Sequence, residues 1–266
     1  MKKISLFICG VLLVVSVSAA QATTIDLTLG KGTTVTYDGA RFHEFDDPDQ
    51  TTVSSGTGVI DPFLTIQRKT WEHSFNSDYF AVLDATRPKW NHSLQISDLI
   101  EYNSGWYEFL LDINEPKNDT SVITQHELEV YIVPNSVGGS LTELENGLTG
   151  LRDVGDLIWD LDRLEDSVIE HDYKIWQGSG QNIDSSFELP TTLFSGYSLD
   201  DYVYLYALFG GKATNSFLGD NNTSEAGFEE YVLREGRTAI PEPGTLFLLG
   251  SGLLGITVFR NKFRKK

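Results

Sequence analysis

The run YVYLYALFG, residues 202–210, is apolar on both of its faces and constrains the fold more than any other segment. Successive side chains of an extended strand point to opposite sides. One side would carry Tyr202, Tyr204, Tyr206 and Leu208, and the other Val203, Leu205, Ala207 and Phe209. A strand that is apolar on both sides lies inside a sheet that is covered on each face. We therefore expect this segment to be a central strand with packed material above and below it.

Three further segments, residues 106–113, 126–134 and 228–235, alternate apolar and polar side chains. This period of two predicts strands with one face in the core and one in water. Weaker strand candidates, mostly bounded by Gly, Asn, Asp or Pro, are residues 32–39, 62–68, 78–84, 92–100, 156–162 and 171–177. About ten strands with little helical periodicity predict an all-β domain, an antiparallel β-sandwich or jelly-roll-like fold, over residues 23–236. Residues 138–150 are the one candidate for a short helix.

The N-terminal residues 1–22 have the three parts of a secretory signal peptide. Lys2 and Lys3 precede the apolar run Ile4–Val17, and Ala20 and Ala22 form a small-x-small cleavage pattern. We expect cleavage after Ala22. A transmembrane anchor is the alternative, but the apolar run is short for a span. The only cysteine, Cys9, leaves with this segment, so the exported body has no thiol and no disulfide.

The charge of the body is more negative than the total of −18 suggests. Two lysines lie in the signal peptide and five cations in the tail, so 13 cations face 38 acids between residues 23 and 243. Such a body repels nucleic acid and anionic lipid. It suits a soluble surface protein, a cation binder or a partner of neutral polysaccharide.

One acidic stretch is a candidate calcium site. Asp153, Asp156, Asp160 and Asp162 follow one another closely in residues 152–166. Calcium takes six to eight oxygen ligands and is abundant outside the cell. The spacing differs from the glycine-pivoted pattern of an EF-hand loop. The alternative is a solvated acidic surface, and apart from this calcium no cofactor is expected.

No constellation typical of an enzyme is recognisable in the sequence. The five histidines are scattered without a paired zinc motif, and Gly-x-Ser-x-Gly is absent. A pair of carboxylates at glycosidase separation remains a third, weaker alternative. The five tryptophans and eleven tyrosines would form either a sugar-stacking platform or the filling of the core. We expect a non-enzymatic body.

The C-terminal tail has three parts. Pro241, Glu242 and Pro243 precede a 15-residue apolar run, residues 245–259. This length is marginal for a membrane-spanning helix and needs help from flanking residues or a thinner membrane. Residues 260–266 are rich in cations, among them Arg260, Lys262 and Arg264. Such cations hold the end of the chain in the cytoplasm, so the body would face outward. A plain C-terminal anchor is the alternative reading of this tail.

This arrangement, over residues 237–266, resembles the PEP-CTERM sorting signal. The resemblance implies recognition and cutting near residues 241–243 by exosortase, a membrane-embedded sorting protease, in a Gram-negative bacterium that makes exopolysaccharide or biofilm. An inner-membrane-anchored intermediate would then reach the cell surface or extracellular matrix. Segments 55–67, 107–114, 202–210 and 227–234 also resemble a recurrent set of uncharacterised exported domains with this tail, for which no catalytic activity is implied.

These observations leave three hypotheses for the function. The first is a structural or interaction protein linked to exopolysaccharide or biofilm. The second is a carbohydrate-binding module, stabilised in one version by calcium, and the third is a glycoside hydrolase or lyase. The expected partners are exosortase, the membrane before processing and polysaccharide, with no nucleic acid.

Overall fold

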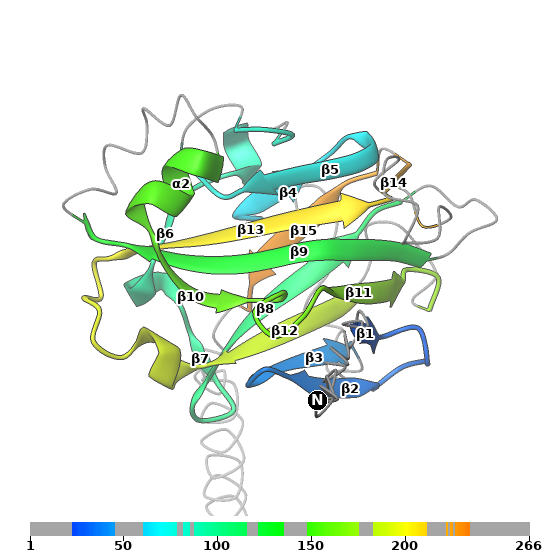
Figure 1. Cartoon of the computed structure of the whole chain (residues 1–266), viewed down its shortest axis with the longest axis horizontal. Helices are drawn as coiled ribbons and strands as arrows, with labels where there is room; N and C mark the ends of the chain where they lie inside the picture. Colours follow the sequence, from blue (N-terminus) through cyan, green and yellow to red (C-terminus); the bar gives the residue numbers. More distant parts are fainter. Residues whose placement is uncertain are drawn as a thin grey trace, which may run out of the picture.

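The computed structural model describes residues 23–45, 61–78, 82–85, 88–115, 122–135, 148–175, 183–211, 222, 224–225 and 227–234. These residues are mostly in strands, as the sequence predicts, and they form two sheets (Figure 1). The predicted signal peptide and the predicted membrane-spanning segment 245–259 lie outside this part of the chain. Within it, no helix has the length and apolar character needed to cross a bilayer.

The first sheet has eight strands, and β13 (Tyr202–Gly210) and β9 (Val122–Val133) lie at its centre. Along its main path the strands are β1 (Thr23–Asp26), β11 (Ser167–Asp172), β9, β13, β5 (Lys69–Phe75) and β14 (Ser224–Glu225). Two others branch from this path: β10 (Asp156–Asp160) pairs with β9, and β6 (Leu94–Gln95) pairs with β13. All pairs are antiparallel except β1 with β11.

The second sheet has seven strands, all paired antiparallel. Its order is β2 (Thr34–Tyr37), β3 (Ala40–Glu44), β12 (Ser185–Pro190), β8 (Trp106–Ile113), β15 (Glu229–Leu233) and β4 (Leu64–Ile66), with β7 (Glu101–Tyr102) paired to β8. The remaining elements are the helix α2 (Leu148–Val154) and the 3-10 turns η2 (Pro88–Trp90), η3 (Ile96–Asp98) and η5 (Thr191–Phe194). The chain repeatedly changes sheet, for example from β8 to β9 and from β11 through β12 to β13.

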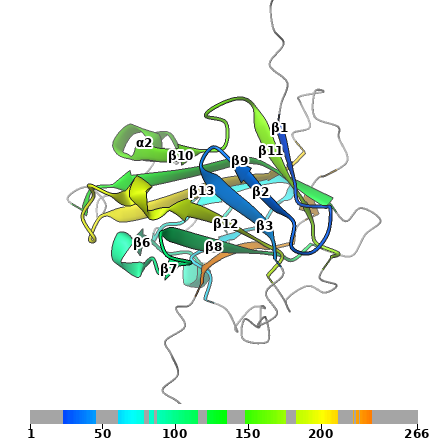
Figure 2. The same ribbon diagram turned by 90° about the horizontal axis from the view of Figure 1, so that it is seen from below.

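The two sheets pack face to face (Figures 1 and 2). Aromatic rings fill part of the core between them. Phe42 of β3 lies 5.9 Å from Trp159 of β10, and Phe209 of β13 lies 6.3 Å from Tyr231 of β15, measured between ring centroids. Each of these contacts joins one sheet to the other. The arrangement is a sandwich-like all-β fold, whose core contains aromatic and aliphatic side chains in place of disulfides.

The central position predicted for residues 202–210 is confirmed. One side of β13 carries Val203, Leu205, Ala207 and Phe209 into the core between the sheets. Its other side, with Tyr204, Tyr206 and Leu208, packs in a second cluster with Leu151 of α2. Helix α2 therefore covers part of the outer face of the eight-stranded sheet (Figure 2).

Three weaker strand predictions were wrong in detail. Residues 92–100 form only the two-residue strand β6 and the turn η3. The strand expected at 171–177 is β11, which ends at Asp172 because the Asp172 carboxylate accepts the Lys174 N–H at 3.0 Å and turns the chain. The described part of 78–84 contains no strand. Helix α2 begins at the end of the stretch where a helix was expected, and residues 136–147 lie outside the described residues.

Candidate functional site

The outer face of the seven-stranded sheet carries a pocket of about 330 Å³. Its wall contains both carboxylates and cations, and the lining residues are Gly32, Thr34, His43, Glu44, Phe45, Tyr102, Asn103, Glu108, Ser186, Glu188 and Arg234. They come from or adjoin β2, β3, β7, β8 and β12, and Arg234 follows β15. Six segments from different parts of the chain therefore form one polar concavity.

Strand register places the charged side chains of the pocket on one face. Glu188 of β12 lies opposite Arg41 of β3 and opposite Glu108 of β8. The adjacent residues in these strands, Phe42, Phe187 and Phe109, are in the core between the sheets. Because side chains alternate along a strand, Arg41, Glu108 and Glu188 must point away from that core.

Each of the two glutamates is paired with a cation. Glu108 accepts a hydrogen bond from Arg234 Nε and a second from Nη2 at 3.4 Å. Glu188 accepts a hydrogen bond from Arg41 Nη1 at 3.3 Å, and His43 Nε2 lies 3.5 Å from the same oxygen. The two carboxylates therefore occupy neighbouring but different electrostatic environments.

These environments shift the two pKa values in opposite directions. Burial raises the pKa of Glu108, and Arg234 offsets this only in part. Burial would also raise the pKa of Glu188, but hydrogen bonds and charge from His43 and Arg41 outweigh it and hold that pKa below its usual range. Glu188 is thus the stronger acid of a directly opposed pair.

Two half-buried aromatic rings stand beside the charged residues. Tyr102 of β7 pairs with Trp106 at the start of β8. The Arg41 guanidinium lies 3.7 Å from the centre of a Trp106 ring, and the Arg234 guanidinium lies 4.2 Å from that of Tyr102. Each ring thus has a guanidinium group against it, and Tyr102 lines the pocket while Trp106 lies beside it.

The other tryptophans lie elsewhere, and Trp90 at the end of η2 is half-buried. Trp159 is buried in the core, as the core-filling interpretation predicts. Trp71 is half-buried against the second cluster, on the outer face of the eight-stranded sheet. Trp176 lies outside the described residues.

The four aspartates predicted as a calcium site are not gathered as a group of three. Asp153 is exposed on α2, while Asp156 and Asp160 lie at opposite ends of β10, roughly 13 Å apart for an extended strand of this length. Asp160 Oδ1 accepts the Asp162 N–H at 2.9 Å, and Asp162 Oδ1 accepts the Ser167 N–H at 2.8 Å. The last two aspartates therefore organise a turn, and calcium at this place remains a prediction that the distances do not favour.

Asp160 and Asp162 have acidic neighbours that the sequence analysis missed. Glu129 of β9 lies opposite Asp160 in the strand register. Burial, and then the charge of Asp162, raise the pKa of Glu127 to about 7. Burial also raises the pKa of Asp162 to about 6, with nearby carboxylates adding to the shift. Only cross-strand pairing could have revealed these neighbours.

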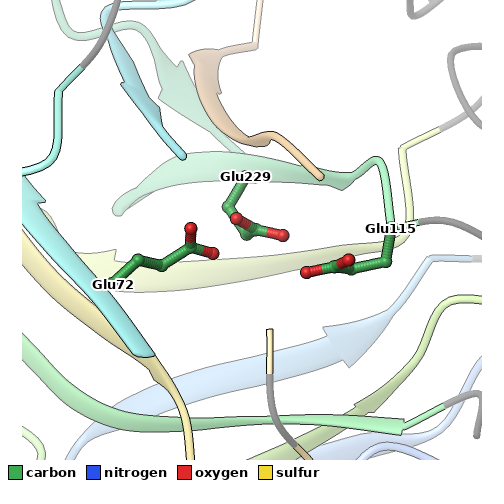
Figure 3. A group of neighbouring side chains, drawn as sticks. All are labelled: Glu72, Glu115 and Glu229. Carbon is green, nitrogen blue, oxygen red and sulfur yellow. The ribbon is translucent and has the colours of Figure 1, made fainter. Parts of the chain in front are cut away.

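Among the described residues, one group of three acidic side chains has ligand atoms close enough to hold a metal ion. The oxygens of Glu72, Glu115 and Glu229 lie within 4.8 Å of one another, and all three residues are buried (Figure 3). Burial raises the pKa of Glu72 to about 6 and, with the charge of Glu72 added, raises that of Glu229 well above its usual value. The sequence contained one indication that Glu229 is buried, because Glu229 shares a strand face with the apolar residues Tyr231 and Leu233.

The predicted processing residues lie outside the described part of the chain. These are Ala20, Ala22, Pro241, Glu242, Pro243, Arg260, Lys262 and Arg264. Comparison with family models nevertheless covers the part of the chain that contains Pro241, Glu242, Pro243, Arg260, Lys262 and Arg264. Residues 239–265 match the model of the PEP-CTERM protein-sorting motif. No curated protein and no solved structure matches the chain.

Proposed function

We propose that this chain has a structural or interaction role in extracellular polysaccharide. It is an exported protein that carries a PEP-CTERM protein-sorting motif and is sorted by an exosortase-type protease. Its body would be a non-enzymatic, jelly-roll-like sandwich at the surface or in the matrix of a Gram-negative bacterium. The observation that carries the proposal is the pocket on the seven-stranded sheet, with Tyr102 and Trp106 beside two ion-paired glutamates.

The chemistry of the pocket suits a polyhydroxylated ligand. Aromatic faces stack on the apolar faces of sugar rings, while carboxylates accept hydrogen bonds from hydroxyls and guanidinium groups donate to ring and hydroxyl oxygens. The net negative charge of the body argues against nucleic acid as the polymer. A neutral polysaccharide fits both the hydrogen-bonding and aromatic groups of the pocket and the negative charge of the body.

The route to the surface follows from the two ends of the chain. The signal peptide would be removed after Ala22, and a helix over residues 245–259 would hold the intermediate in the inner membrane with residues 260–266 in the cytoplasm. Exosortase would then cut near residues 241–243. Intact mass of the mature protein tests this route: we expect a start at Thr23 and an end near Pro243, whereas a chain that runs through Lys266 would indicate a lasting anchor.

The binding proposal is tested with the full chain, purified in detergent, and the exopolysaccharide of the producing organism. Trp106→Ala and Tyr102→Ala should each weaken binding roughly tenfold, or about 1.4 kcal/mol, as expected for an aromatic anchor. Trp71→Ala, on the outer face of the other sheet, is the matched control and should bind normally. Wild-type protein that binds no polysaccharide, or equal losses in all three variants, would contradict the proposal.

A second candidate function is glycoside hydrolysis, favoured by the opposed pair Glu108 and Glu188. Directly opposed residues in an antiparallel pair have Cβ atoms about 4.5–5.5 Å apart, and carboxylates with pKa values shifted apart suit an acid and a nucleophile. Release of reducing ends that Glu108→Gln abolishes would support it. Binding without turnover would support the non-enzymatic role.

A further inference from the structure

Three glutamates from both sheets meet at one end of the sandwich interior. Glu72 belongs to β5 of the eight-stranded sheet, Glu229 begins β15 of the seven-stranded sheet, and Glu115 lies two residues beyond the end of β8. Figure 3 shows the three carboxylates directed toward a common space. Glu229 is more than a hundred positions from both other glutamates in the sequence, yet the fold brings the three acids together.

Strand register explains why these acids point inward. Glu72 lies opposite Phe209, and Glu229 lies opposite Ile113 on one side and Ile66 on the other. These three apolar partners belong to the core between the sheets. Directly opposed residues share a sheet face, so both glutamates project into the same interior from opposite walls.

The negative charge of Glu72 and Glu229 is not balanced by the described residues. Both side chains are 0 % exposed, and no described lysine or arginine forms an ion pair with either. Glu72 Oε2 accepts the Arg68 N–H, whereas Glu72 Oε1 and both oxygens of Glu229 have no cation or backbone N–H as a partner among the described residues. Glu229 lies within hydrogen-bonding reach of Glu72 and Glu115, which are themselves acids. Burial of carboxylates is costly unless a counter-charge or a metal compensates it.

The spacing and the donor set fit a hard divalent cation. Calcium lies about 2.3–2.6 Å from its oxygen ligands, so two oxygens bound to one ion can be at most about 5 Å apart. One oxygen from each of the three glutamates lies within 4.8 Å of the others, which is inside that span. Carboxylate oxygens alone favour calcium, magnesium or manganese over softer metals, and calcium accepts irregular geometry and is abundant outside the cell.

We infer that Glu72, Glu115 and Glu229 bind one calcium ion, which ties the two sheets of the sandwich together. The ion replaces, in this disulfide-free body, a covalent link between the sheets. The site is separate from the polysaccharide pocket, because Glu229 faces the interior while the pocket lies on the outer face of the same sheet. The inference therefore stands or fails independently of the proposed function.

The local backbone holds Glu115 close to Glu229. The Asn114 N–H donates to the Phe228 carbonyl at 2.8 Å, and the Gly227 N–H donates to Glu115 Oε2 at 3.3 Å. A Cβ atom at Gly227 would lie 2.3 Å from the Asn114 carbonyl oxygen, so only glycine permits this approach. The end of β8 and the start of β15 are thereby held side by side.

The test measures the thermal unfolding of the full chain in EDTA and in calcium, together with stoichiometry by isothermal titration calorimetry. We expect one calcium ion per chain and a rise in Tm of roughly 5–11 °C at a calcium concentration of 100 times Kd. Glu229→Gln should abolish this rise. In EDTA, the same variant should be at least as stable as the wild type, because it removes an uncompensated buried charge.

Two further variants keep the test decisive. Glu72→Gln removes a ligand from the opposite sheet and should also abolish the rise, which covers the case in which Glu229→Gln fails to fold. Asp153→Asn removes an exposed acid of the aspartate stretch and should leave the rise unchanged. A loss of the calcium response in Asp153→Asn would overturn the assignment.

Other outcomes also overturn the inference. The glutamates could instead share protons; then neither EDTA nor calcium would change Tm at pH 7.5, and Tm would rise on acidification to pH 5. Magnesium that stabilises the chain more than calcium would overturn the choice of ion. A calcium response of full size in both glutamate variants would place the ion elsewhere.

Discussion

Replacing Arg234 with methionine should leave the buried Glu108 carboxylate without its cation and make the stability of the protein strongly pH-dependent. The side chains of Glu108 and Arg234 are 4 % and 11 % exposed, and Arg234 is the cation that pairs with Glu108. Methionine keeps an unbranched stem of similar length but carries no charge. The variant therefore leaves Glu108 buried without its partner.

Removal of one partner of a buried ion pair costs about 3–5 kcal/mol. For a domain of this size the loss corresponds to a drop in Tm of roughly 6–20 °C at pH 8. The pKa of Glu108 is already raised by burial, and without Arg234 it rises further. A carboxyl whose folded pKa exceeds its unfolded value stabilises the fold below the unfolded pKa, and this contribution is lost as pH rises through the folded pKa. The deficit of the variant should therefore shrink as pH falls toward about 4.5.

The assay is a double-mutant cycle of Arg234→Met and Glu108→Gln, followed by urea unfolding at pH 5 and pH 8. The double variant should recover much of the loss, with a coupling free energy of at least about 2 kcal/mol at pH 8. Arg68→Met is the control, because Arg68 is 52 % exposed in its pair with Asp84, and the Asp84 carboxylate keeps a second partner, the His73 N–H at 3.1 Å. Loss of such an exposed pair costs less than about 1 kcal/mol. Equal costs for the two arginine variants, or a deficit that does not change with pH, would refute the reasoning.

Two other predictions concern the backbone and a buried histidine. Gly210→Ala should lower the free energy of unfolding by at least about 2 kcal/mol, because φ is +86° there and a Cβ would lie 2.4 Å from the Thr70 carbonyl oxygen. Gly196→Ala should lower it by only about 1 kcal/mol, because φ is +103° but nothing lies within 4 Å of the added Cβ. Equal losses in urea unfolding would contradict this. His171 is buried, and burial lowers its pKa to about 3, so its ring should stay neutral in an NMR titration down to about pH 4. Because the pKa of His171 in the folded protein is below its value in the unfolded chain, the stability that His171 contributes is complete above about pH 6.5 and is lost as pH falls. A His171 ring that titrates near pH 6.5 in the folded protein would contradict this.

Local patterns predicted the strands best where the residues themselves carry the signal. The apolar run at residues 202–210 and the alternation at residues 106–113 correspond to β13 and β8, since both patterns are properties of consecutive residues. The face of residues 106–113 that was expected in water is nevertheless buried, because Leu110 and Asp112 are each 1 % exposed. Prediction failed at residues 92–100 and 171–177, where side-chain and backbone hydrogen bonds turn the chain. Those bonds are local, but they compete with a strand in a way that periodicity does not register.

The candidate sites depended on pairing between distant strands. Glu108 and Glu188 are separated by 80 positions and become neighbours only through the register of β8 and β12. The aspartate stretch looked like a site because its acids are close in sequence. An extended strand nevertheless separates Asp156 from Asp160. Closeness in sequence was therefore a poor guide to closeness of ligands.

By itself, the sequence determined the class of the fold, the absence of any disulfide in the body and the sorting motif at residues 239–265, because each of these is carried by consecutive residues or by composition. Only the tertiary structure decided which acids lie on which side of a sheet. Glu229 and Glu230 are adjacent, yet Glu229 faces the core between the sheets beside Glu72, while Glu230 lies on the other side of its sheet, where it is also buried. The reason is physical: the facing of a strand and the stacking of two sheets are set by the burial of the whole core, which no single segment contains.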